Sequence, residues 1–221
     1  MTKYYGPSFV LACASLFLSP STHANMIRNP SFEEPAPTSS RHALHWKMNE
    51  PDTHGDAYGS ASREDWRSHD GMNIMTVRGT WANAGDHGGV WQEAAAEAGK
   101  TYRASAWFWA DPDWDPEVQE LKMEFFNADY SVLLKTESVA LRKIPTAWER
   151  REITAKAPER TAWVRLVINV EGTGDNGALQ IDSIYMSPRD TFKEPTPEPV
   201  DVIIDLLDEP EDEPENEEPA D

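Results

Sequence analysis

The sequence predicts an all-β protein, specifically a jelly-roll β-sandwich, and three observations support this fold class. Between Asn25 and Pro188 the apolar residues alternate with polar ones in short runs, as in strands with one buried face. Gly, Pro, Asn and Asp separate these runs at regular intervals, which is typical of sandwiches and jelly rolls. No segment keeps a helical period over a convincing length, which argues against a parallel sheet with crossover helices.

Eight runs have the alternation and the flanking turn residues expected of strands. In the run 161–170, for example, Val164, Leu166 and Ile168 form an apolar side, and Trp163 and Arg165 lie on the other side. A further short strand is expected at 44–48, within an irregular stretch, 35–70, that is rich in Pro, Ser, His and Asp. The eight predicted strands are 72–79, 88–94, 101–110, 119–127, 131–139, 148–155, 161–171 and 178–187.

The net charge of −19 is concentrated at the C-terminal end of the chain. Residues 193–221 hold one Lys, 13 acidic residues and six prolines, a composition that predicts a disordered tail. Residues 25–192 hold 18 basic and 26 acidic residues, as expected for one ordinary globular domain. Neither part offers the basic surface that nucleic acid or an anionic membrane requires, so both are excluded as partners.

Residues 1–24 have the features of a secretory signal peptide. Lys3 precedes an apolar run, 9–18, which is too short to span a membrane, and cleavage is expected after Ala24. The protein is therefore expected to be secreted, to the periplasm or the extracellular space. The only cysteine, Cys13, lies in this segment, so the mature chain would have no disulfide and would depend on packing or a bound metal.

Several strands combine aromatic side chains with charged and amide groups on one face. Such a face suits a sugar, because the C–H patches of the ring stack on aromatic rings and the hydroxyl groups take polar contacts. The alternative is that the tryptophans fill a second hydrophobic layer under loops, since Trp is usually largely buried. The candidate ligand-binding residues are Trp91, Gln92, Trp107, Trp109, Glu124, Arg165 and Asn169.

Five segments, in the same order, resemble the CenC-like (family 4/9) carbohydrate-binding modules. They are NMIRNPSFEE, DGMNIMTVRG, GGVWQEAAAEAGKTYRASAWFWA, AWERREITAKAPERTAWVRLVINVEG and GALQIDSIYMSP. The resemblance covers roughly residues 25–188 and implies a jelly roll of the galactose-binding-domain-like type.

The resemblance also implies a structural calcium ion that ties the first turn to the last strand. The matching carboxylates are Glu33 and Asp182, with backbone oxygens from near Ser31 and from the turn 69–71. Calcium takes six to eight oxygen ligands, and bridging two distant carboxylates would pin both ends of a domain without disulfides. The alternative is that Glu33 and Asp182 are ordinary turn residues or form hydrogen bonds only.

The sequence thus predicts a secreted, non-catalytic carbohydrate-binding module that recognises a polysaccharide or glycan. We find no nucleophile elbow and no recognisable catalytic carboxylate pair. Two alternatives stay open: a jelly-roll polysaccharide lyase or glycoside hydrolase, and a structural or adhesive envelope protein. In the tail, the apolar patch from Val200 to Leu207 is either a motif that binds a protein partner, a strand that folds back on the sandwich, or a segment without a role.

Overall fold

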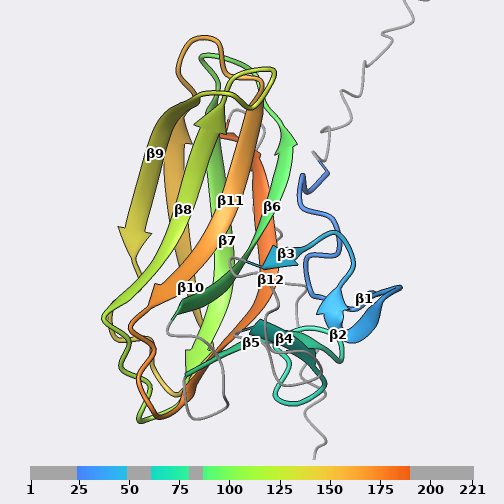
Figure 1. Cartoon of the computed structure of the whole chain (residues 1–221), viewed down its shortest axis with the longest axis vertical. Helices are drawn as coiled ribbons and strands as arrows, with labels where there is room; N and C mark the ends of the chain where they lie inside the picture. Colours follow the sequence, from blue (N-terminus) through green and yellow to red (C-terminus); the bar gives the residue numbers. More distant parts are fainter. Residues whose placement is uncertain (1–23, 49–60, 80–86, 190–221) are drawn as a thin grey trace, which may run out of the picture.

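The computed structural model describes residues 24–48, 61–79 and 87–189. Over these ranges the chain forms two five-stranded sheets packed face to face, with a small two-stranded hairpin beside them (Figure 1). This arrangement confirms the predicted all-β jelly-roll sandwich. The predicted acidic tail, including Val200 to Leu207, and the signal peptide up to His23 lie outside the described residues. None of the described segments forms a helix that could cross a membrane.

Each sheet combines strands that are distant in sequence. Sheet I has the order β10-β7-β12-β5-β4, and sheet II has the order β3-β6-β11-β8-β9. The hairpin consists of β1 (Pro35–Ala36) and β2 (Ser39–Ala43). Sheet I contains β4 (Ala61–Glu64), β5 (Ile74–Arg78), β7 (Thr101–Ala110), β10 (Glu149–Lys156) and β12 (Ala178–Pro188). Sheet II contains β3 (Lys47–Met48), β6 (His87–Ala95), β8 (Val118–Phe126), β9 (Leu133–Ala140) and β11 (Trp163–Glu171).

All eight predicted strands are present, with ends shifted by a few residues. The strand expected at 44–48 is shorter, because His45 has a φ of 73° and this turn separates β2 from β3. The stretch 35–70 is less irregular than expected, since it also contains β1, β2 and β4.

The core lies between the two sheets and follows from the alternation within each strand. From sheet II, β11 contributes Val164, Leu166 and Ile168, each at most 1% exposed. From sheet I, β7 contributes Ala106 and Phe108, both fully buried. Burying a large apolar side chain contributes roughly 1.5–3 kcal/mol relative to leaving it exposed. The opposite sides of the same strands therefore face outward and are available for function.

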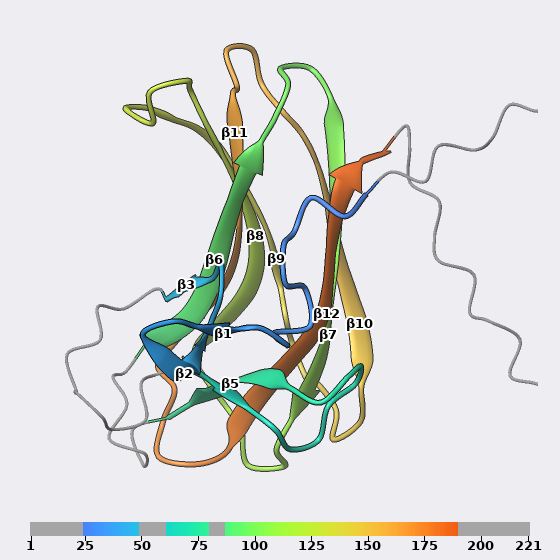
Figure 2. The ribbon, with the colours of Figure 1, turned by 90° about the vertical axis from the view of Figure 1, so that its right-hand side faces the viewer.

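The N-terminal segment closes the open edge between the two sheets (Figure 2). It runs beside β12, where the Met26 amide donates to the Met186 carbonyl at 2.9 Å and the Ile184 amide donates to the Pro30 carbonyl at 3.0 Å. The side chain of Asn25 adds contacts to the same strand. This edge therefore connects the first described residues to the last strand.

Candidate functional site

Four of the predicted ligand-binding residues lie together on the outer face of sheet II. The antiparallel register places Arg165 of β11 opposite Glu124 of β8 and opposite Glu93 of β6. Trp91 is two residues before Glu93, and Asn169 is four residues after Arg165, so both share this face. Pairing between β6, β11 and β8 thus gathers Trp91, Glu124, Arg165 and Asn169 on one surface.

Trp91 is held between two cations on this face. The ammonium of Lys47 lies 4.4 Å from the Trp91 ring centre, and the guanidinium carbon of Arg165 lies 4.1 Å from it. The two cations come from β3 and β11, the strands on either side of β6. Cation–π contacts of this kind are worth about 0.5–2 kcal/mol. Trp91 therefore supports the surface more than it offers an open ring for stacking.

The same row continues into three further aromatic rings. The Arg165 guanidinium lies 4.6 Å from the Phe126 ring, Phe126 lies 5.1 Å from Tyr130, and Tyr130 lies 5.4 Å from Trp163. The indole N–H of Trp163 donates to the Ala128 carbonyl at 3.2 Å, which orients its ring. We call the contiguous set Lys47, Trp91, Arg165, Phe126, Tyr130 and Trp163 the ring row.

Tyr130 and Trp163 were not among the sequence candidates. Trp163 could have been included, because it alternates onto the same side of β11 as Arg165. Tyr130 lies in the turn between β8 and β9 with a φ of 60°, and nothing in the sequence indicates that its ring folds back over the sheet.

Two polar atoms of the ring row are buried. Arg165 Nε has no hydrogen-bond partner among the described residues, and the Tyr130 hydroxyl lies near the Glu93 carboxylate without forming a well-aligned hydrogen bond. Burial, together with the nearby charge of Glu93, raises the pKa of Tyr130 to about 12, so the phenol keeps its proton. Both atoms lie beneath the surface, so a ligand on this face would meet the rings of the row and not these two donors.

The cations that the register places on this face are each paired with a carboxylate. Surface pairs contribute little stability, but they cancel the local positive charge. Among the described residues of this face, no cation is therefore left uncompensated to attract an acidic ligand. The pairs are Lys47 with Glu93 at 3.3 Å, Lys122 with Glu120 at 3.1 Å, and Arg165 with Glu124 at 3.5 Å.

Gln92 does not reach the outer face of sheet II. It follows Trp91 directly, so the pleat turns its side chain inward, where it is 2% exposed. Its amide oxygen accepts from the Arg28 amide at 2.8 Å, and its amide nitrogen donates to the Arg28 carbonyl at 2.9 Å. Gln92 thus binds the N-terminal segment and is separate from the other candidates.

Trp107 and Trp109 also lie apart from this face, because β7 belongs to sheet I. Their rings are covered by the segment that connects β4 to β5. His69 stacks on Trp107 with ring centres 4.1 Å apart, and the Arg67 guanidinium lies 4.6 Å from the Trp109 ring. Packing beneath a loop is the alternative interpretation that the sequence left open for these two tryptophans. Apart from the inward-facing Gln92, the predicted set therefore divides between the outer faces of two sheets.

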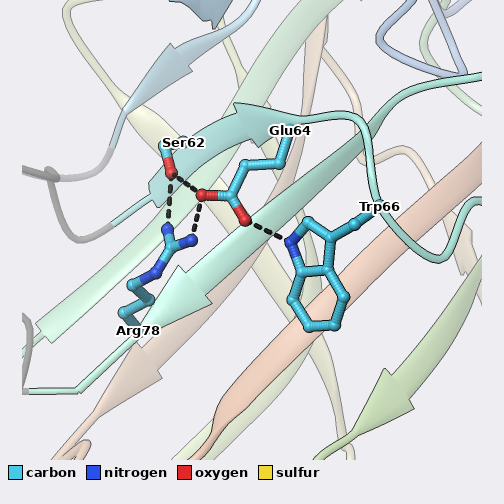
Figure 3. A network of polar contacts seen from close by, with 4 residues as sticks. All are labelled: Ser62, Glu64, Trp66 and Arg78. Atoms are coloured by element: carbon cyan, nitrogen blue, oxygen red, sulfur yellow. Dashed lines mark hydrogen bonds and ion pairs between the residues drawn. The ribbon is translucent and has the colours of Figure 1, made fainter.

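The start of that covering segment is anchored by a polar network on β4 and β5 (Figure 3). The Glu64 carboxylate accepts from Arg78, from the Ser62 hydroxyl and from the indole N–H of Trp66. Arg78 also donates to the Ser62 hydroxyl at 2.6 Å. The network holds Trp66 at the point where the chain leaves β4.

Glu33 and Asp182 bind the same turn, as the sequence suggested, but through N–H groups. One oxygen of Glu33 accepts from the Met72 and Asn73 amides at 2.8 and 2.9 Å, and the other accepts from the Asn73 side chain at 2.6 Å. These bonds outweigh the opposing effect of burial and hold the pKa of Glu33 below its usual value.

Asp182 is fully buried and holds the other end of this turn. One of its oxygens accepts from the His69 and Asp70 amides at 2.8 and 3.0 Å, and the other accepts from the Ser183 amide. Ser31, the remaining predicted calcium ligand, donates its hydroxyl to Asp70 at 3.3 Å. All three predicted ligands therefore contact the 69–73 turn.

This donor set does not form a calcium cage as it stands. Both carboxylates face N–H donors, whereas calcium requires oxygens turned toward the ion. Within the described residues, no group of three or more His, Cys, Asp or Glu side chains could hold a metal ion. The observed geometry is that of a hydrogen-bonded turn, and the calcium ion stays a prediction from the resemblance.

Thermal unfolding tests the calcium prediction directly. If calcium binds at Glu33 and Asp182, its addition raises Tm and a chelator reverses the rise, with about 2.7 kcal/mol of stabilisation at a hundredfold excess over Kd. The increase should disappear in Glu33→Gln, because the amide removes the negative charge. A Tm that calcium and chelator leave unchanged in the wild-type protein contradicts the prediction and leaves Glu33 and Asp182 as hydrogen-bond acceptors only.

Comparison with known proteins supports the fold. No family model and no curated protein matches the sequence. Among solved structures, the enzymatically active domain of tailspike protein 4 from bacteriophage CBA120 is similar with a TM-score of 0.55 at 11% identity, covering 77% of this chain and 22% of that chain. A Stig cyclase from Fischerella sp. TAU gives 0.51 at 12% identity, covering 74% and 97%. The module TmCBM61, solved with beta-1,4-galactotriose, gives 0.48 at 18% identity, covering 75% and 99%.

The two similarities with TM-scores above 0.5 concern the fold alone, because both identities are low. This chain also spans only a small part of the tailspike protein that it matches. The resemblance to CenC-like modules stays a prediction. Because a shared fold does not determine function, the function depends on the side chains of the two outer faces.

Proposed function

We propose that the protein is a secreted, non-catalytic carbohydrate-binding module that binds a neutral polysaccharide on the outer face of sheet II. One observation carries the proposal: a row of aromatic rings on this face lies beside the polar Arg165–Glu124 pair. A sugar presents both kinds of partner, since its hydroxyl oxygens accept hydrogen bonds and its C–H patches stack on rings. Secretion rests on the signal-peptide pattern at 1–24.

The charge balance of the face supports a neutral ligand. Each cation already has a carboxylate partner, so a uronic acid or sulfate group would meet Glu93, Glu120 and Glu124 without gaining an unpaired cation. Placing like charges together would oppose binding of acidic polymers. The same pairing engages the carboxylates, which supports a binding role over acid–base catalysis.

Binding can be measured by affinity electrophoresis on neutral glucan, xylan and galactan, with pectin and alginate as acidic polymers. We expect Trp163→Ala to raise Kd about 30-fold, because truncating an aromatic anchor costs about 2 kcal/mol. Tyr130→Ala, which removes another ring of the row, should raise Kd about fivefold, corresponding to about 1 kcal/mol. Met72→Ala, at an exposed apolar residue outside sheet II, is the matched control and should bind as the wild type does.

The outcomes separate the function classes. Retention on neutral polymers that Trp163→Ala abolishes supports the proposal. Release of reducing ends or unsaturated products from any polymer would instead assign an enzyme. Absence of retention on every polymer would count against carbohydrate binding and favour a structural role.

A further inference from the structure

A pocket lies on the outer face of sheet I, on the opposite side of the sandwich from the ring row. Its volume is about 430 Å³, and Trp107 and Tyr185 contribute aromatic surface to it. We propose that this pocket binds a single sugar unit or the end of a neutral glycan chain, independently of sheet II. The ligand class rests on the proposed function; the existence of the pocket does not.

A bulge in β12 gives the pocket its shape. The pairing of β12 with β7 shifts register between Asp182 and Tyr185, and Ser183 there has a φ of 48°. Such bulges redirect side chains and locally interrupt pairing. Next to this interruption, the small side chain of Ser105 on β7 forms part of the pocket lining.

The lining matches one or two sugar rings in size and polarity. Ligand pockets usually measure about 300–1,000 Å³ and combine apolar walls with a few polar groups. Here the apolar walls are supplemented by Asp70 and Arg150, which carry opposite charges. A neutral, hydroxylated ligand suits such a pair, since it can donate to the carboxylate and accept from the guanidinium.

The pocket is preformed. Asp182 accepts the His69 and Asp70 amides, and Nδ1 of His69 lies 2.9 Å from the Ser183 hydroxyl. The His69 ring, which stacks on Trp107, also lines the pocket. The N-terminal segment forms a further wall at Pro30. Walls on several sides favour a chain end over the middle of a polymer.

NMR of the tryptophan indole N–H groups reports the two surfaces separately. Methyl glycosides of glucose, galactose, xylose and arabinose are titrated singly into ¹⁵N-labelled full chain, with Trp107→Phe and Trp163→Phe used to assign the two signals. We expect at least one glycoside to shift the Trp107 signal, with Kd about 1 mM, and to leave the Trp163 signal in place.

Two variants distinguish a loss of glycoside binding from a loss of the folded structure. Ser105→Leu fills the pocket from the outward side of β7 and should raise the glycoside Kd at least tenfold without moving the other indole signals. Trp163→Ala changes only the ring row and should leave the Kd reported by the Trp107 signal unchanged.

The two proposals fail in different ways. If no glycoside shifts the Trp107 signal, or if Ser105→Leu binds as the wild type does, the pocket proposal is overturned, whatever sheet II binds. If a glycoside shifts Trp107 while no polysaccharide shifts Trp163, the pocket proposal stands and the function proposed for sheet II fails.

Discussion

Replacing Arg78 with alanine is expected to lower the free energy of unfolding by about 3–5 kcal/mol. The side chains of Arg78 and Glu64 are only 9% and 13% exposed, and the substitution leaves the Glu64 carboxylate buried without its cation (Figure 3). Urea unfolding measures the effect. The matched control is Lys135→Ala, which removes the cation of the exposed Lys135–Glu137 pair on β9 and should cost less than about 1 kcal/mol.

The pKa of Glu64 gives a second measure of the same network. Burial acts to raise it, but hydrogen bonds from Arg78 and Trp66 outweigh burial and hold the pKa below its usual value. This contribution to stability is present above the unfolded pKa of 4.5 and is lost as pH falls through the folded pKa.

Equal losses of stability in Arg78→Ala and Lys135→Ala would contradict a structural role for the network.

Asp182 should make stability depend on pH in the opposite direction. Burial and the adjacent charge of Asp70 raise its pKa from 3.8 to about 6, against the lowering effect of its three N–H donors. The folded state therefore binds this proton more tightly than the unfolded chain does. Its stabilising contribution is complete below about pH 4 and is lost as pH rises through about 6, with a loss on the order of 1–3 kcal/mol.

The measurement compares wild type with Asp182→Asn, in the presence of a chelator, from pH 4 to pH 7. Glu33 and Glu64 titrate with the opposite sign, so only the difference between the two proteins isolates Asp182. The stability of the wild type relative to the variant should decrease across this range. A difference that stays constant with pH would show that Asp182 has an ordinary pKa in the folded protein.

Much of the fold could be predicted because strand alternation is a local property. Residues that alternate along one strand must lie on one side of it, whatever the strand pairs with. This is why the eight main strands and the inward side of β11, with Val164, Leu166 and Ile168, are as predicted. The same rule would have separated Gln92 from its neighbour Trp91.

The candidate site was only partly predictable, because it depends on which strands become neighbours. Arg165 and Glu124 were correctly expected to face outward, but only the pairing of β11 with β8 brings them together. Trp107 shows the same outward alternation, yet β7 pairs with β10 and β12 and belongs to the other sheet. Tyr130 reaches the ring row from a turn with positive φ, for which the sequence holds no signal.

The sequence by itself determined that this protein is an all-β sandwich and which side of each strand is apolar, because the pleat acts between adjacent residues. The tertiary structure alone decided that the tryptophans occupy two separate outer faces, one with the ring row and one with the pocket beside Trp107. It also decided that Glu33 and Asp182 bind one turn through N–H groups. These features depend on contacts between residues more than 30 positions apart, and local patterning carries no information about such pairing.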